Sequence, residues 1–196
     1  MDILTVPSLD EVTIQSIAPL TEHLPLSFSN LLSRSHCFPT KLNINTAFEE
    51  SGVLRIFSLV SLQNLTTLHV GNYCEDNLQP ISTLTLHPEA ESSVSLLPRL
   101  EKLYLHLYDS LHLDDLTSVV EMVRSRSSWH IHERVKVASR LALFAFIPIG
   151  GRRLPNLCGA LIPLLAFSEE GLELVIDRFY LEKVDRTKRL DYKPRK

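Results

Sequence analysis

The stretch Leu100-Glu101-Lys102-Leu103-Tyr104-Leu105 decides the fold class, because its spacing recurs along the chain. An apolar residue is followed by two variable residues, a second apolar residue, one variable residue and a third apolar residue. The alternation at the end of this pattern predicts a β-strand with one buried face. Further copies, some close and some loose, begin at Leu9, Pro39, Leu65, Leu141 and Gly171.

The copies begin 26 to 41 residues apart, which is irregular and mostly longer than the usual leucine-rich repeat. Segments with helical spacing of apolar residues lie between them, around 54–62, 116–123 and 157–165. In the second segment, Asp114 and Asp115 at the start and Arg124 and Arg126 at the end match the helix dipole. This alternation of strand and helix predicts parallel strands joined by crossover helices.

The variable positions of the copies distinguish two α/β architectures. In a doubly wound sheet helices cover both faces, and the strands are near-continuous apolar runs. Here Asp, Glu, Thr, Lys, Asn, His and Tyr recur at every second position, which predicts one open sheet face. We therefore predict an α/β leucine-rich-repeat solenoid of about six irregular repeats over residues 1–182. Its curved parallel sheet would line the concave side and its helices the convex side.

Aligning the copies places one side chain of each strand in a row on the open face. In this row His69 lies beside Tyr104, and His106 and Tyr108 follow on the strand of Tyr104. Tyrosine combines a large contact area with a polar end, and it is common at interfaces. The predicted partner-binding residues are Asn43, His69, Tyr104, His106 and Tyr108, although each of them could instead simply solvate an exposed sheet. The whole row is Thr13, Asn43, His69, Tyr104, Ala145 and Val175.

The order and distances of several segments resemble a known family, over about two thirds of the chain. The segments are 65–70, 97–105, 119–126 and 169–176. They are similar to the leucine-rich-repeat region of the F-box proteins of mushroom-forming (basidiomycete) fungi. The resemblance implies a protein–protein interaction module that recognises substrates for an F-box-type ubiquitin ligase. The F-box itself, which docks on the ligase adaptor, is not found, and repeat spacing already starts at Leu9. Binding of a ubiquitin-ligase adaptor is therefore in doubt.

Two other functions stay open: a repeat-only scaffold unrelated to ubiquitin, and an α/β enzyme with its active site at the strand ends. The sequence has no GxGxxG, Walker, HExxH or GxSxG motif, so we expect no enzyme, cofactor or metal site. Gly150-Gly151-Arg152-Arg153 could hold an anion but is typical of a flexible connection. His130-Ile131-His132 lacks an identifiable third metal ligand.

The charge is unevenly distributed. The net charge is −3, but residues 183–196 hold seven Lys or Arg against two acidic residues, which leaves −8 for residues 1–182. An acidic body does not suit nucleic acid, whose phosphates require clustered cations. We expect the basic segment 183–196 to be a disordered tail, and residues from about 125 to 139 to be a polar insertion between repeats.

The remaining expectations concern the compartment and the ends. Three cysteines without CxxC spacing, no secretory signal and no long apolar stretch favour an intracellular protein of the cytoplasm or nucleus, without membrane contact. Repeat arrays need polar caps, and none is seen around Leu9. Either something outside this sequence covers Ile3–Ile14, or the isolated chain self-associates.

Overall fold

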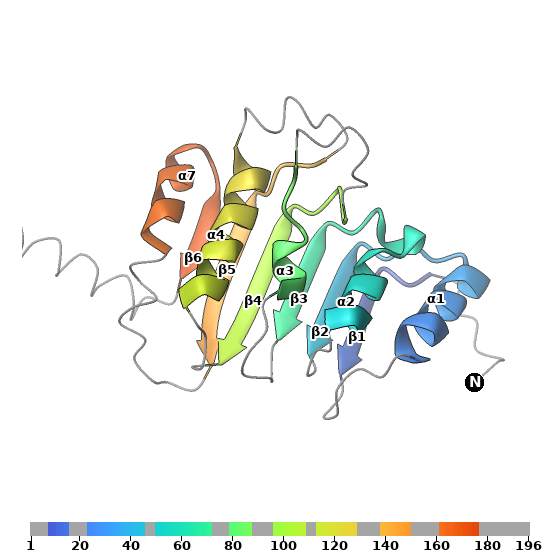
Figure 1. Cartoon of the computed structure of the whole chain (residues 1–196). Coiled ribbons are helices and arrows are strands. Elements are labelled where there is room, and N and C mark those ends of the chain that lie inside the picture. The colour runs from blue at the N-terminus through green and yellow to red at the C-terminus, as the bar shows by residue number, and fades with distance from the viewer. Residues whose placement is uncertain are drawn as a thin grey trace, which may run out of the picture.

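A computed structural model describes residues 8–15, 23–45, 50–71, 79–87, 96–108, 113–128, 138–149 and 161–176. Within these residues, six parallel strands form one sheet in the order β1-β2-β3-β4-β5-β6 (Figure 1). Each predicted copy of the repeat pattern supplies one strand. The strands are β1 (Glu11–Gln15), β2 (Lys41–Asn45), β3 (Thr67–Gly71), β4 (Lys102–Tyr108), β5 (Leu143–Ile149) and β6 (Glu173–Ile176).

The register of the sheet joins equivalent positions of the copies. Thr13 pairs with Asn43, and the row continues through His69, Tyr104 and Ala145 to Val175. The backbone repeats as well, because the residue after the first apolar position accepts N–H groups from the next copy. These acceptors are the carbonyls of Asp10, Thr40, Thr66, Glu101 and Ala142. The prediction of parallel strands in this register is confirmed.

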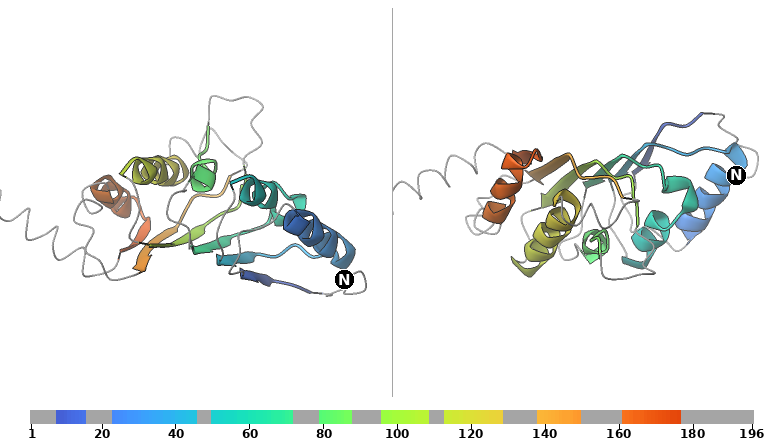
Figure 2. Two further views of the ribbon diagram at one scale, coloured as in Figure 1. Left: turned by 60° about the horizontal axis from the view of Figure 1, so that its bottom comes forward. Right: turned by 90° about the horizontal axis from the view of Figure 1, so that it is seen from above.

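The helices of the described part lie on one face of the sheet, which leaves the other face open (Figure 2). When the strand order follows the chain and all crossovers have the same hand, all the connecting helices lie on the same face of the sheet. A doubly wound sheet would reverse its strand order and carry helices on both faces. The helices are α1 (His23–Ser35), α2 (Glu50–Phe57), α3 (Gln79–Ser82), α4 (Leu113–Ser127) and α7 (Leu165–Glu169), with 3₁₀ turns η1 (Val60–Leu62) and η2 (Ile162–Leu164).

The core lies between the sheet and the helices. Leu103 and Leu105 of β4 are fully buried there, and so are Leu116 and Val119 of α4. Of the corresponding side chains in the outermost strands, Val12 and Ile14 of β1 and Leu174 of β6 are only partly buried. In the described part of the chain, each outer strand has a neighbouring strand on one side only, so fewer side chains cover its apolar residues.

Two helices end in the same backbone motif with different residues. The Cys37 N–H donates to the Leu32 carbonyl after α1, and the Leu172 N–H donates to the Phe167 carbonyl after α7. These bonds define Schellman motifs, in which one residue takes a left-handed conformation. That residue is Gly171 after α7, with φ 97°, but it is His36 after α1, with φ 50°.

The end of α4 differs from the sequence-based prediction. Ser125, Arg126 and Ser127 belong to the helix and are buried. The sequence predicted Arg126 at the helix end, but it also predicted a polar insertion from about residue 125, and burial of these three side chains was not expected. Apolar Val119 and Val123 precede Arg126 at helical spacing, so all three lie on the face of α4 that meets the core. Residues 129–137 of the predicted insertion lie outside the described residues.

Candidate functional site

The open face of the sheet, opposite the helices, carries three rows of side chains. Successive residues of a strand point to opposite faces, so the buried leucines define the open face by exclusion. Alignment of the repeat copies predicted the middle row, and it also predicted His106 and its neighbours of the third row on this face. The first row is Glu11, Lys41, Thr67, Lys102, Leu143 and Glu173, and the third is Gln15, Asn45, Gly71, His106 and Ile147.

Three of the predicted residues form an aromatic cluster on β3 and β4. The rings of His69 and Tyr104 are stacked, with centroids 4.0 Å apart and an interplanar angle of 4°. His106 lies beside them, its ring centroid 6.3 Å from that of His69. Because the two strands pair in register, their side chains stand next to each other and order one another. We call His69, Tyr104 and His106 the aromatic cluster.

Both histidines of the aromatic cluster favour the neutral imidazole. Partial burial lowers the pKa of His69 below 6.5, the nearby His106 lowers this pKa further, and Glu11 opposes the shift. Burial also lowers the pKa of His106 below 6.5. At neutral pH the cluster is therefore an uncharged surface with both hydrogen-bond donors and acceptors.

The two other predicted residues flank the aromatic cluster. Asn43 lies next to His69 in the middle row and is half-buried. Tyr108 lies in β4 opposite Ile149, but its side chain is outside the described part of the structure. The structure thus brings four of the five residues to one area of the open face.

Gly71 lowers the sheet surface beside the cluster. A Cβ atom at Gly71 would meet the Asn45 side-chain oxygen, 2.5 Å away, so the amide of Asn45 lies over the glycine. Gly71 is the register partner of His106 and is buried. The absence of a side chain here lets the Asn45 amide lie close to the backbone.

The open face changes character at β5. Leu143, Ala145 and Ile147 occupy the open positions of this strand, and Val175 of β6 is 41 % exposed. Ala145 was expected to be a solvent-facing member of the middle row, but it is 1 % exposed. A methyl group between the larger Tyr104 and Val175 is shielded by its neighbours. The face is therefore polar over β1 to β3, aromatic at β4 and apolar at β5.

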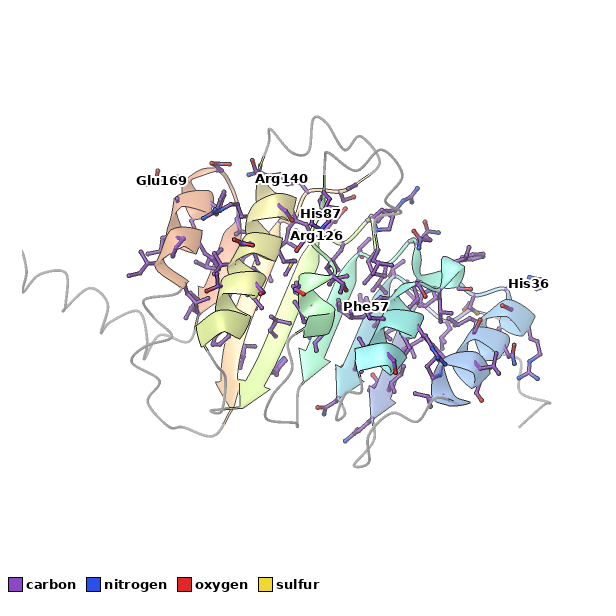
Figure 3. All side chains as sticks on the ribbon, in the orientation of Figure 1. His36, Phe57, His87, Arg126, Arg140 and Glu169 are labelled. Carbon is purple, nitrogen blue, oxygen red and sulfur yellow. The ribbon has the colours of Figure 1, made fainter. Side chains whose placement is uncertain are left out.

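Arg126 has a role that the sequence reasoning missed. Its guanidinium is buried and donates to the carbonyls of Leu84, Leu96 and Leu97 (Figure 3). Burial lowers the pKa of Arg126 to about 10, so the group is still charged at neutral pH. An arginine on the apolar stripe of α4 was the available signal, but it was interpreted as a helix-end cation.

A second arginine joins the end of α4 to the following repeat. The Arg140 side chain, labelled in Figure 3, donates to the carbonyls of Ser127 and Glu170. It thereby connects α4 with the turn before β6. Both arginines lie near the top of the view in Figure 3, and their printed bonds go to main-chain carbonyls.

Other candidate chemistry falls largely outside the described residues. His130-Ile131-His132, Gly150-Gly151-Arg152-Arg153 and the segment 183–196 all lie there. Within the described ranges, no group of three or more His, Cys, Asp or Glu could hold a metal ion. The helices in these ranges are all too short or too polar to cross a membrane.

Comparison with protein-family models, curated proteins and solved structures finds no match for this chain. The function proposed below therefore rests on the residues of the chain itself.

Proposed function

We propose that this chain is a leucine-rich-repeat solenoid whose open sheet face binds a partner protein. The observation that carries the proposal is the aromatic cluster, in which His69 stacks on Tyr104 at 4.0 Å on the side of the sheet opposite the described helices. An ordered aromatic surface loses little side-chain entropy on binding, because its neighbours already fix the rings. Such residues are typical anchors of protein interfaces.

The repeat architecture supports the same proposal. A stacked array presents one extended surface built from equivalent positions, and such surfaces commonly bind other proteins. Each strand adds one residue to each row, so the face can match an elongated partner along six strands. We further propose, from the resemblance to F-box proteins, that the partner is a substrate of a ubiquitin ligase and that the chain acts inside the cell.

The experiment measures how much of each co-purifying protein is recovered with the unchanged chain and with two single variants of it. Tyr104→Ala removes the stacking partner of His69, whereas Arg55→Ala changes an exposed residue of α2 on the helix side. We expect a partner that is recovered with the unchanged chain and with Arg55→Ala, and is lost at least tenfold with Tyr104→Ala. Equal recovery with all three proteins contradicts the proposal.

The ligase role needs its own measurement. If the chain delivers substrates, blocking the proteasome should increase the amount of the recovered partner, and a ligase adaptor should co-purify under native expression. If blocking the proteasome leaves the amount of partner unchanged and no adaptor co-purifies, the result would favour the repeat-only scaffold.

A further inference from the structure

The lysines of the described residues are confined to the open face. These two lysines are Lys41 and Lys102, and both are exposed. The arginines of the same residues lie in helices or in the turns before strands instead. In a chain whose residues 1–182 carry a net charge of −8, both lysines thus lie on one side of the sheet, in a row that ends in Glu11 and Glu173.

The two lysines form a defined arrangement with Thr67. Lys41 pairs with Thr67, and Thr67 pairs with Lys102, so the lysines stand on either side of the threonine in the first row. With strands about 4.8 Å apart, their Cα atoms are separated by about 10 Å. Thr67 is 9 % exposed and forms the floor between the two longer side chains. Among the described residues, neither lysine forms an ion pair with a carboxylate.

The aromatic cluster adjoins this arrangement directly. His69 follows Thr67 by two residues on β3, and Tyr104 follows Lys102 by two residues on β4. Side chains two residues apart in a strand share a face, so the ammonium groups and the aromatic rings border one surface. Beyond Tyr104 this surface continues into the apolar Leu143 and Ile147 of β5.

We infer that the open face receives an acidic segment of the partner protein. Its carboxylates would lie above Thr67 between Lys41 and Lys102, and its apolar side chains would cover Tyr104 and β5. Charge complementarity carries the inference, because it selects partners and accelerates association. The inference rests on the proposed function and adds the chemistry of the partner to it.

The same row limits how far the positive region extends. Glu11 lies beside Lys41 in β1, and Glu173 lies beside Leu143 in β6. A nucleic acid has a continuous phosphate backbone that would meet these carboxylates and needs a longer basic track. A short protein segment with one or two carboxylates fits a region three strands wide.

Proton uptake by His69 gives a second signature of the acidic partner. The charged groups facing His69 are Glu11 of β1, Lys41 of β2, and Lys102 and His106 of β4. Burial and His106 lower the pKa of His69 below 6.5, and Glu11 opposes this shift. A bound carboxylate raises this pKa, so binding takes up a proton. Affinity should therefore rise about threefold to tenfold as the pH falls from 7.5 to 5.5, whereas it should fall for an uncharged partner.

The test selects random twelve-residue peptides displayed on phage against the full chain. Two matched charge variants, Lys41→Gln/Lys102→Gln on the open face and Arg55→Gln/Arg124→Gln on the helices, serve for comparison. We expect the enriched peptides to be rich in Asp and Glu next to aromatic or aliphatic residues. Their affinity should drop at least tenfold with the lysine variant, less than twofold with the arginine variant, and strongly with added salt.

The other outcomes separate the inference from the proposed function. Enriched peptides that need Tyr104 but are neutral or basic overturn the acidic partner and leave the proposed function intact. Peptides that bind regardless of Tyr104, or no enriched peptides at all, contradict both. An oligothymidylate of twelve nucleotides that displaces the peptides better than polyglutamate would assign the face to nucleic acid and overturn the inference.

Discussion

At the scale of single residues, Arg126 shows how a charged group can serve inside this core. The guanidinium joins the end of α4 to three carbonyls that come from the segment after α3 and from the turn before β4. One of these carbonyls belongs to Leu97, whose φ of 47° is unusual for a branched residue. Arg126 therefore holds a strained turn in place at the start of the strand that carries Tyr104.

Replacing Arg126 by methionine should strongly destabilise the protein. The change removes three hydrogen bonds to main-chain carbonyls, of which, within the described residues, only that of Leu97 keeps another donor, the Leu100 N–H. The free energy of unfolding should therefore fall by about 3 to 5 kcal/mol. Urea denaturation of the purified chain measures this. Arg124→Met, at an exposed position of the same helical turn, should cost less than about 1 kcal/mol. Similar losses for both variants would contradict the role of Arg126.

The histidines of the aromatic cluster should make stability depend on pH in one direction. Their pKa values lie below 6.5 in the folded state, so the unfolded chain takes up protons first as the pH falls. Their contribution is complete above about pH 6.5 and is lost as the pH falls through the folded pKa values. We expect denaturation midpoints to decline less between pH 7 and 5 in His69→Gln/His106→Gln than in the unchanged chain.

The matched control is His87→Gln, which changes an exposed histidine after α3. Its midpoints should follow those of the unchanged chain across this pH range. A double variant that declines as steeply as the control would show that the two cluster histidines are not responsible.

At the scale of elements, the strands were predictable and several helix ends were not. The strand register follows from apolar alternation, because slipping by one residue would turn the buried leucines to solvent. The row from Thr13 to Val175 could therefore be predicted in full. Local spacing does not show which polar residue of a helix is buried, nor which loop carbonyls it contacts. The burial of Arg126 and its bonds to three carbonyls could therefore not be predicted. The shielding of Ala145 also depends on its neighbours across the sheet, which the strand pattern does not reveal.

Replacing the residue with positive φ should change the free energy of unfolding in opposite directions in the two Schellman motifs. His36→Gly should raise the free energy of unfolding by about 0.5 to 1 kcal/mol, because glycine adopts a positive φ without a steric penalty. Gly171→Ala should lower it by about 1 kcal/mol, since the backbone there has φ 97°, while the new Cβ would make only an ordinary contact with the Arg140 side chain at 3.9 Å. Thermal denaturation of both variants measures the pair, and a shift in the same direction for both would refute this explanation.

At the scale of the whole molecule, the two edges of the sheet differ from its centre. In the described residues β1 has a neighbouring strand on one side only, and its Val12 and Ile14 are partly buried. Free backbone groups beside partly exposed apolar residues favour pairing with another strand. The expected need for a cover near Ile14 thus has a structural basis, although residues 1–7 lie outside the described ranges.

A charge on β1 should reduce self-association of the isolated chain. Thr13 is exposed on the open face of this edge strand, so Thr13→Lys adds a charge to the free edge without disturbing the core. Sedimentation velocity of the unchanged chain should reveal oligomers that grow with concentration, and the variant should stay monomeric over the same range. A monomeric unchanged chain would contradict this expectation.

The most direct test of the account asks which histidines the partner covers. Diethyl pyrocarbonate modifies accessible imidazoles, and mass spectrometry quantifies each site in the free chain and in the purified complex. His69 and His106 lie on the open face, while His36 and His87 are exposed outside the sheet. We predict that complex formation slows modification of the first two several-fold and leaves the other two unchanged. Protection of His36 or His87 with His69 and His106 still reactive would place the partner elsewhere and contradict the account.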